Sequence, residues 1–215
     1  MTKTNTCWTP SSFPIEKSDI PIKGMIHIGA HYAQEYEDYI NYGIKNIMFI
    51  EPLKDNYEKL LERLAEEPRL DNTVALKMAI GNTIGEIEMF VETANHGMSS
   101  SILEPGTHLD SYPGITFDTK ETVKIDKLDN VEFDRSKYDT LNVDVQGYEL
   151  EVFKGAEETL KHINTIFTEI NIGEVYKGCG KMSEIDEYLE TFGFVRIFTH
   201  LYDNKGFGDA IYIKG

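Results

Sequence analysis

Short apolar segments alternate with amphipathic ones in the first part of the chain. The segments 24–30, 45–52 and 72–82 are apolar and end in glycine, proline or a turn, which is typical of buried strands. Between them, 33–43 and 55–67 repeat apolar residues at helical spacing. Strands that alternate with helices in this way predict a parallel, doubly wound sheet.

The middle of the chain has a different pattern. Segments 86–91, 98–103 and 121–126 are short, and the stretches between them lack helical periodicity. Strands connected by loops alone cannot make parallel crossovers. We therefore expect a small antiparallel inset here.

The alternation resumes after the inset. The pattern predicts a strand over 139–145, a helix over 148–160, a strand over 165–171 and a helix over 183–193, with Ser183 as the N-cap of the last helix. These elements extend the same predicted sheet.

The chain closes with two apolar segments, 194–200 and 209–215, joined by a linker too short for a helix. Such a connection requires a hairpin, so the last strand should run antiparallel to the others. Residues 1–22 are rich in Pro, Ser and Thr and predict an extended N-terminal arm, which leaves 23–215 as one domain.

Charge and composition narrow the classes of partner. The 215 residues carry a formal net charge of −16, and no dense Lys/Arg cluster offsets it, so a nucleic-acid partner is not expected. No apolar run approaches the length of a membrane span, and the start lacks a secretory stretch. Cys7 and Cys179 lie far apart without ligand spacing, which indicates free thiols and a cytoplasmic location.

Candidate chemistry lies where the predicted strands end. In the strand over 139–145, Asn142 and Asp144 alternate with aliphatic residues, and Gln146 follows at the same spacing. Residues two apart share one face of a strand, and an unpaired carboxylate inside a core is costly. The alternative is a structural polar network or a cap on the following helix; we favour a face that opens into a site.

The first two strands favour a nucleoside site. Gly29 allows a close backbone approach after the first strand, and Glu51 at the tip of the second can accept hydrogen bonds from ribose hydroxyls. A dinucleotide turn needs further glycines where this chain has His31 and Ala33, so pyrophosphate binding is disfavoured. A cationic nucleoside suits the acidic rim, which points to S-adenosylmethionine.

Several segments, in order from about residue 24 to 214, resemble the FkbM family of S-adenosylmethionine-dependent methyltransferases. The matching segments are "MIHIGAHYAQE", "FIEP", "ALKMAIGN", "MSSSIL", "LNVDVQGYELEVFKGA", "FTEINIGEVYKGCGKMSEIDEYL" and "FGDAIYIK". The resemblance implies a Rossmann-like class I methyltransferase fold that methylates a hydroxyl of a small sugar or natural-product acceptor. The chain departs from many members in two places: in the turn, His31 and Ala33 replace Asn and Gly, and on the later strand Asn142 replaces Lys.

The resulting hypothesis assigns two sets of residues. The catalytic candidates are Asp144, Glu169 and His200, and the candidate contacts with S-adenosyl-L-methionine are Gly29, Ala30, His31, Glu35, Glu51, Pro52, Ala79, Ile80, Ser100, Ser101, Asp144 and Gln146. No metal is expected, although the oxygens of Asp144, Glu169 and Asn171 could suit Mg²⁺.

Two other functions stay open at this point. One is a catalytically inactive nucleoside-binding or scaffolding protein, because nothing in the sequence guarantees a working base. The other is a nicotinamide-dependent oxidoreductase on a similar sheet, against which the missing glycines and the closing hairpin argue. The sequence predicts neither the oligomeric state nor the identity of the acceptor.

Overall fold

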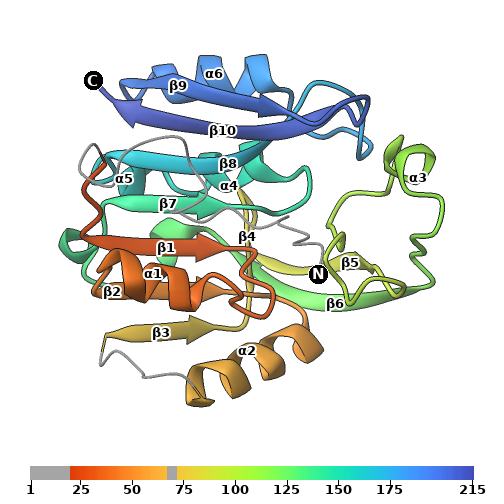
Figure 1. Ribbon diagram of the computed structural model, residues 1–215, viewed down its shortest axis with the longest axis horizontal. Helices are drawn as coiled ribbons and strands as arrows, with labels where there is room; N and C mark the ends of the chain where they lie inside the picture. The colour runs from red at the N-terminus through yellow and green to blue at the C-terminus, as the bar shows by residue number, and fades with distance from the viewer. Residues whose placement is uncertain (1–19, 67–71) are drawn as a thin grey trace.

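The computed structural model describes residues 20–66 and 72–215, so nearly all of the predicted arm lies outside the described residues. A seven-stranded sheet in the order β3-β2-β1-β7-β8-β10-β9 forms its centre (Figure 1). Its strands are β1 (Gly24–Ile28), β2 (Asn46–Ile50), β3 (Thr73–Leu76), β7 (Thr140–Val143), β8 (Thr165–Asn171), β9 (Phe194–Leu201) and β10 (Phe207–Lys214). The pairs from β3 to β8 are parallel, and β10 is antiparallel to both β8 and β9, which confirms the predicted sheet and hairpin.

A second sheet of three strands confirms the inset in part. It has the order β4-β6-β5, formed by β4 (Ala79–Ile80), β5 (Gly85–Val91) and β6 (Thr119–Asp126). The β5–β6 pair is antiparallel, whereas β4 runs parallel to β6. The single strand predicted over 72–82 is wrong, because its second half leaves β2 and pairs with β6 instead.

The strand predicted over 98–103 is also wrong. Only Ser101 makes a single bridge, to Phe90. The serine hydroxyls bond to the backbone instead: Ser100 Oγ accepts from the Glu92 N–H at 2.9 Å, and Ser101 Oγ donates to the Gln146 carbonyl at 2.7 Å. Such side-chain bonds compete with a strand ladder, and here they hold the segment as a turn.

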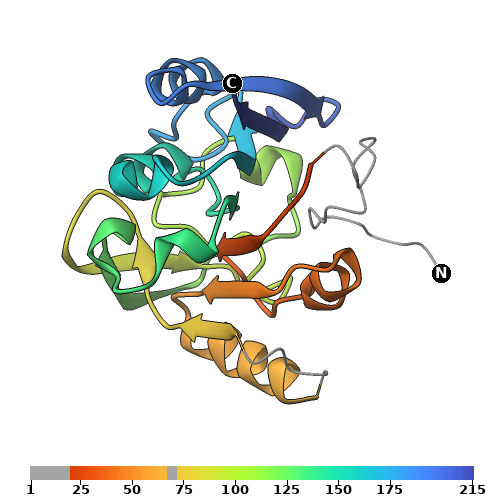
Figure 2. The same cartoon turned by 90° about the vertical axis from the view of Figure 1, so that its left-hand side faces the viewer.

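Helices cover both faces of the large sheet. They are α1 (Tyr36–Tyr42), α2 (Lys54–Glu66), α4 (Glu149–Lys154), α5 (Glu157–Leu160) and α6 (Met182–Glu190), with a short α3 (His108–Ser111) beside the inset. Figure 2 shows α1 on one side of the sheet and α4, α5 and α6 on the other. This is the doubly wound arrangement that the alternation predicted.

Two helix predictions need correction. The helix expected over 148–160 divides into α4 and α5 at Gly155, where a Cβ atom would lie 2.1 Å from the Gly81 carbonyl oxygen. Ser183 is not the N-cap of α6, which begins one residue earlier. The N-cap is Lys181, whose N–H donates to the Glu184 carboxylate at 2.8 Å.

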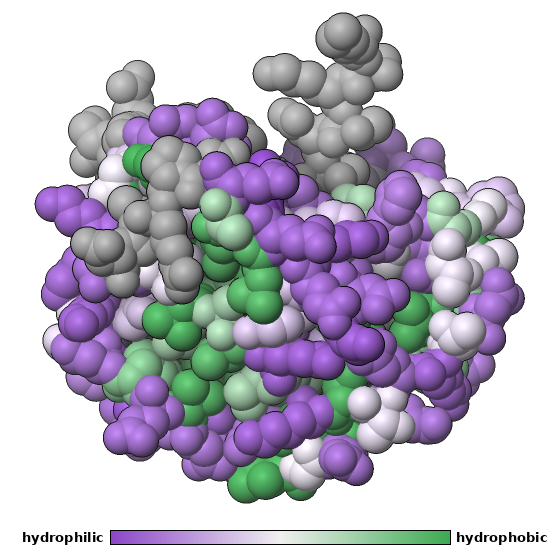
Figure 3. All heavy atoms as spheres, turned by 90° about the horizontal axis from the view of Figure 1, so that it is seen from below, coloured by the Kyte–Doolittle hydropathy of each residue, from purple (hydrophilic) through white to green (hydrophobic). Residues whose placement is uncertain are grey.

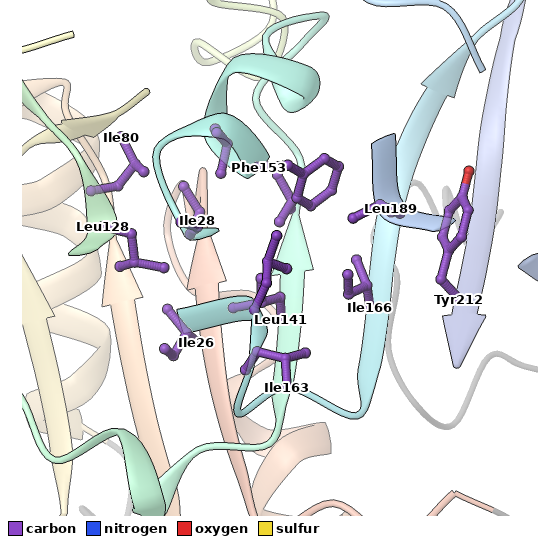
Figure 4. Packing of buried hydrophobic residues seen from close by; sticks show 14 of the residues in the cluster. Ile26, Ile28, Ile80, Leu128, Leu141, Phe153, Ile163, Ile166, Leu189 and Tyr212 are labelled. Carbon is purple, nitrogen blue, oxygen red and sulfur yellow. The ribbon is translucent and has the colours of Figure 1, made fainter. Parts of the chain in front are cut away.

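Two hydrophobic layers pack against the two faces of the central strands. Successive residues of a strand point to opposite faces, so β1 and β7 contribute side chains to both layers. Figure 4 shows the layer under α4 and α6, where Ile28, Leu141 and Ile166 gather near Phe153 and Leu189. Burying each such side chain contributes about 1.5–3 kcal/mol, which makes the strand ends a rigid platform.

The outer surface agrees with the acidic composition. The face seen from below in Figure 3 carries mainly hydrophilic residues, with smaller groups of hydrophobic ones between them. Within residues 20–66 and 72–215, no helix combines the length and apolar character needed to cross a bilayer.

Candidate functional site

The carboxyl ends of β1, β2, β7 and β8 meet at one edge of the sheet. The Gly29 N–H donates to the Ile50 carbonyl at 2.9 Å, and the Asp144 N–H donates to the Ile28 carbonyl at 3.0 Å. These bonds bring the tips of three neighbouring strands together, at the edge where open α/β sheets bind their ligands.

Gly29 makes the closest approach at this edge. Its φ of +83° lies in the left-handed region, and a Cβ atom would fall 1.8 Å from the Asp144 carbonyl oxygen. No residue with a side chain fits there without displacing the turn after β7. The close approach predicted from the sequence is therefore present, with the β7 turn as the neighbour.

Two adjacent cavities open beyond the strand ends. The first, which we call the apolar cavity, has a volume of about 50 Å³ and is bounded by Ile50, Leu53, Met78, Ala79, Ile80 and Met89 together with Glu51. The second, the carboxylate cavity, has a volume of about 250 Å³ and contains Glu35, Asp144, Glu169 and Asp209 in its wall. Residues common to both walls are Gly29, His31, Met98, Asp144 and Gln146.

Glu51 is held rigidly at the wall of the apolar cavity. It is only 4% exposed, and its carboxylate accepts from the N–H groups of His31 at 2.9 Å and Leu53 at 3.0 Å. Burial raises the pKa of Glu51 to about 7, and the two N–H bonds act in the opposite direction. The residue is therefore not a solvated charge at a strand end.

His31 lies between the two cavities. Its ring Nε2 is 2.8 Å from the His96 carbonyl oxygen, and its Nδ1 is 2.7 Å from the Gln34 amide nitrogen. Its φ of 47° is uncommon for a residue with a side chain. The contact of the His31 ring with the His96 carbonyl therefore holds the segment around His96 against the turn after β1.

Gln146 bridges the two carboxylates at the base of the carboxylate cavity. Its Nε2 lies 2.6 Å from Asp144 Oδ1 and 3.3 Å from Glu169 Oε2, and its Oε1 accepts from the Tyr176 hydroxyl at 2.9 Å. Burial raises the pKa of Asp144, and burial together with repulsion from Asp144 raises the pKa of Glu169 well above its usual range. A raised pKa makes the carboxylate form of each group a stronger base.

Glu149 stabilises the turn after β7 through hydrogen bonds to its backbone. It is fully buried, and its Oε1 accepts from the Gly147 N–H at 2.9 Å and the Val145 N–H at 3.2 Å. Burial raises the pKa of Glu149 to about 7. The residue holds the turn that carries Asp144 and Gln146.

Asn142 serves a different purpose from Asp144. Its Nδ2 donates to the Tyr39 hydroxyl at 2.7 Å, and that hydroxyl lies 3.2 Å from His27 Nδ1. Burial lowers the pKa of His27 to about 3, so the imidazole is neutral. The polar face predicted for this strand is therefore a structural network at Asn142, and it reaches the cavities at Asp144 and Gln146.

Most of the predicted site residues line one or both cavities. Those that do are Gly29, Ala30, His31, Glu35, Glu51, Pro52, Ala79, Ile80, Ser100, Asp144, Gln146 and Glu169. Whether they contact a cofactor or acceptor stays a prediction.

Two of the predicted site residues, Ser101 and His200, line neither cavity. Ser101 is fully buried and its hydroxyl is committed to the Gln146 carbonyl. His200 is exposed on β9, the edge strand, where its ring lies 5.0 Å from that of Tyr202. Neither position suits contact with bound molecules in the cavities.

The structure adds residues that the sequence prediction missed. Asp209 of β10 lies directly opposite Glu169 of β8 and accepts a hydrogen bond from the Tyr202 hydroxyl. Tyr112 and His108 contribute ring surfaces to the same cavity. An aspartate within the apolar run "FGDAIYI" was the one available signal for Asp209.

The described residues give no support for a metal centre. Among them, no group of three or more His, Cys, Asp or Glu side chains is arranged to hold an ion. Asn171, the third member of the alternative magnesium set, lines neither cavity. The absence of a metal requirement stays a prediction.

The family can be decided from the extent of the sequence match. The "Methyltransferase FkbM domain" matches residues 27–196, which include every strand tip described above. The chain belongs to this family. The match confirms the resemblance noted in the sequence.

Two curated proteins are similar to this FkbM chain over part of its length. The 2-O-methyltransferase NoeI of Sinorhizobium fredii is 30% identical over 136 residues, covering 60% of this chain and 56% of that protein. The hexuronic acid methyltransferase AglP of Haloferax volcanii is 30% identical over 129 residues, covering 60% and 48%. The chain thus spans about half the length of the curated relatives it matches.

Solved structures support the fold of the FkbM chain. The methyltransferase FkbM from Methylobacillus flagellatus superposes with a TM-score of 0.59 at 13% identity, over 89% of this chain and 43% of that one. The magnesium protoporphyrin IX methyltransferase from Synechocystis, solved with S-adenosylmethionine bound, gives 0.52 at 9% identity, over 89% and 69%. The fold is that of the class I methyltransferases.

Proposed function

We propose that the chain is an S-adenosylmethionine-dependent O-methyltransferase that acts on a hydroxyl of a small, sugar-like acceptor. The observation that carries this proposal is the pair of cavities that share Asp144 at their junction. One cavity suits a nucleoside and the other a polar acceptor. A methyl transfer needs both molecules in contact at one point, in line with each other.

The apolar cavity fits the donor. Glu51 is fixed where it can accept from both ribose hydroxyls, and Ala79 and Ile80 supply apolar surface for an adenine ring. Gly29 and Asp144 border the same cavity, where the methionine portion of the donor would lie.

The carboxylate cavity fits an acceptor that must lose a proton. When bound, S-adenosylmethionine supplies an electrophilic methyl group on a sulfonium, so the protein need only orient the acceptor oxygen and receive its proton. Asp144 lies at the junction, and Glu169 is joined to it through Gln146. Of the two, Asp144 borders both cavities, and the raised pKa of its carboxyl strengthens its carboxylate form as a general base.

The names of the relatives support the class of acceptor. One is named for transfer to a 2-oxygen and the other for a hexuronic acid. A hydroxyl of a sugar or glycan precursor is consistent with both names and with the many polar groups in the carboxylate cavity. The cytoplasmic location expected from the cysteines belongs to this proposal, and the buried thiol of Cys179 agrees with it.

The proposal is tested by titration and turnover. Saturation with S-adenosylmethionine to 100 times its dissociation constant should stabilise the protein by about 2.7 kcal/mol, whereas NAD should not stabilise it. Release of S-adenosylhomocysteine should then depend on an added sugar acceptor. Donor binding without turnover on any sugar would favour an inactive nucleoside-binding protein, and stabilisation by NAD alone would favour an oxidoreductase.

A further inference from the structure

The wall of the carboxylate cavity contains a histidine whose nitrogens the protein itself does not use. His108 belongs to α3, borders the cavity and is only 4% exposed. Its Nδ1 is buried and has no hydrogen-bond partner among the described residues. A buried polar atom without a partner destabilises a protein, so its presence in a cavity wall points to a function of the imidazole.

Packing does not account for the imidazole. The ring centroid of His108 lies 5.0 Å from that of Tyr112, 6.0 Å from that of Phe117 and 5.3 Å from that of Tyr176. These aromatic contacts fix the plane of the ring. A phenyl ring would make the same contacts without burying an unpartnered nitrogen. A purely structural role would therefore favour phenylalanine at this position.

The state of the imidazole decides what it can offer to a bound molecule. Burial lowers the pKa of His108, although the nearby Glu92 carboxylate acts in the opposite direction, so the neutral ring dominates at pH 7. A neutral imidazole carries one N–H. Because an unpartnered buried N–H is rarer than an unpartnered acceptor, the proton is favoured on Nε2. Since Nδ1 is buried, Nε2 is the nitrogen that a molecule in the cavity can reach.

The backbone around His108 is held in place by a neighbouring segment. The N–H groups of Gly106 and His108 donate to the Val175 carbonyl at 2.9 and 3.1 Å, and the Thr107 N–H donates to the Glu174 carbonyl at 3.0 Å. A Cβ atom at Gly106 would lie 2.3 Å from that Glu174 oxygen. The position of the imidazole is therefore fixed before any molecule binds, as orientation of a reactant requires.

The same segment connects His108 with the junction of the cavities. Tyr176 follows Val175, packs its ring against His108 and donates from its hydroxyl to Gln146 Oε1 at 2.9 Å. Gln146 in turn contacts Asp144 at 2.6 Å. His108 and Asp144 both border the carboxylate cavity, so one bound molecule with several hydroxyls can meet both residues.

We propose that His108 is an acceptor-binding residue, whose Nε2–H donates a hydrogen bond to one oxygen of the sugar while Asp144 faces the hydroxyl that is methylated. This inference rests on the proposed function. An acceptor that lacks the oxygen bound by His108 is a poorer substrate, which makes His108 a determinant of specificity.

The test begins with the methyl glycosides of glucose, galactose and mannose at saturating S-adenosylmethionine. Release of S-adenosylhomocysteine gives kcat/KM for each, and the best of the three is used with the variants. His108→Phe keeps the ring and removes both nitrogens. Its kcat/KM should fall at least about 5-fold, in the range of one uncharged hydrogen bond. The donor dissociation constant should stay within about 2-fold, and the melting temperature should equal or exceed that of the wild type, because an unpartnered buried atom is gone.

Two further variants separate hydrogen bonding from shape. His108→Gln can place an amide N–H near the position of Nε2, so its kcat/KM should exceed that of His108→Phe at least about 3-fold. The matched control is His162→Phe, at an exposed histidine after α5, which should stay near the wild type. If His108→Phe fails to fold, His108→Leu takes its place in every comparison.

Deoxy forms of the best glycoside identify the oxygen that His108 binds. For one of them, kcat/KM of the wild type should fall at least about 5-fold relative to the parent glycoside, and that of His108→Phe less than about 2-fold. Such a difference measures the coupling between the side chain and that oxygen directly. If every deoxy form affects both proteins equally, the inference is wrong.

The other outcomes also decide. A smaller loss of kcat/KM in His108→Phe, an equal loss of donor affinity, or a lower melting temperature would overturn the inference and leave the proposed function intact. Binding of S-adenosylmethionine without turnover of any of the three glycosides would overturn the inference and the sugar acceptor with it. Failure to bind S-adenosylmethionine would remove the proposed function as a whole.

Discussion

The two cavities lie side by side at the ends of the same strands, yet each wall contains groups that the other lacks. Aliphatic and methionine side chains surround the apolar cavity, where Glu51 is fixed by backbone N–H groups. The carboxylate cavity gathers acids, imidazoles and phenols whose pKa values are shifted by burial and by one another. The first wall is suited to recognition by shape, and the second to proton chemistry.

Replacing Asp144 at the junction should have the largest effect. Asp144→Asn keeps the shape and can keep the contact with Gln146, but it removes the carboxylate. We expect a folded protein whose rate constant falls about 100-fold or more, in the range of general-base loss. Steady-state S-adenosylhomocysteine release measures this change.

The matched control for this prediction is Asp55→Asn, an exposed aspartate at the start of α2. Its rate should stay near that of the wild type. A folded Asp144→Asn protein with a wild-type rate would show that the polar residues after β7 have only a structural role. The proposed division into a donor cavity and a cavity for proton transfer would then be wrong.

Replacing Glu51 should affect donor affinity instead of chemistry. Glu51→Ala removes the acceptor proposed for the ribose, and it should weaken S-adenosylmethionine binding by about 1.5–3 kcal/mol, the usual contribution of a charge-assisted hydrogen bond. The rate at saturating donor should change much less. Calorimetric titration tests the assignment, and an unchanged dissociation constant would contradict it.

The ionisation of Glu149 makes the stability of the protein depend on pH. Burial raises the pKa of Glu149 to about 7, so the native state binds a proton that the unfolded state releases above the ordinary glutamate pKa of 4.5. This group therefore makes stability fall as the pH rises from 4.5 through 7.

Glu149→Gln should raise the melting temperature at pH 8 by about 2–6 °C and have little effect at pH 5. The Gln oxygen can still accept the N–H bonds of Gly147 and Val145. Melting curves of both proteins across this pH range measure the difference. A variant that is less stable than the wild type at pH 8 would mean that the ionised carboxylate stabilises the turn.

The smallest effect is expected at His200, outside both cavities. His200→Ala should leave kcat/KM within about 2-fold of the wild type, as for most surface substitutions. A larger loss of kcat/KM in the steady-state assay would indicate that His200 belongs to the site, and that the site reaches the edge strand β9.

Much of the fold could be predicted because its signals are local. Apolar periodicity identified the strands and helices of the large sheet, and the short linker before β10 required the antiparallel hairpin. The division of 72–82 into β3 and β4 could not be predicted, because it depends on β6, which lies far along the chain. The bond from the Ser101 hydroxyl to the Gln146 carbonyl could not be predicted either, because it is another long-range contact.

The difference between local signals and long-range contacts also applies to the site. Gly29, Glu51 and Asp144 could be found because parallel strands end at one edge, so polar residues that follow them meet there. Asp209 could not, because its proximity to Glu169 depends on the register of β10 against β8. His200 lies directly opposite Asp209 in β9, but the outer position of that strand keeps it from the cavities.

The central claim is that the apolar cavity holds the donor and the carboxylate cavity the acceptor. A crystal structure with S-adenosylhomocysteine tests it most directly. The account predicts the adenosine in the apolar cavity, its ribose hydroxyls within hydrogen-bonding distance of Glu51, and its sulfur beside Asp144 with the carboxylate cavity open. A nucleoside seated against Glu169 and Asp209, away from Glu51, would contradict the account.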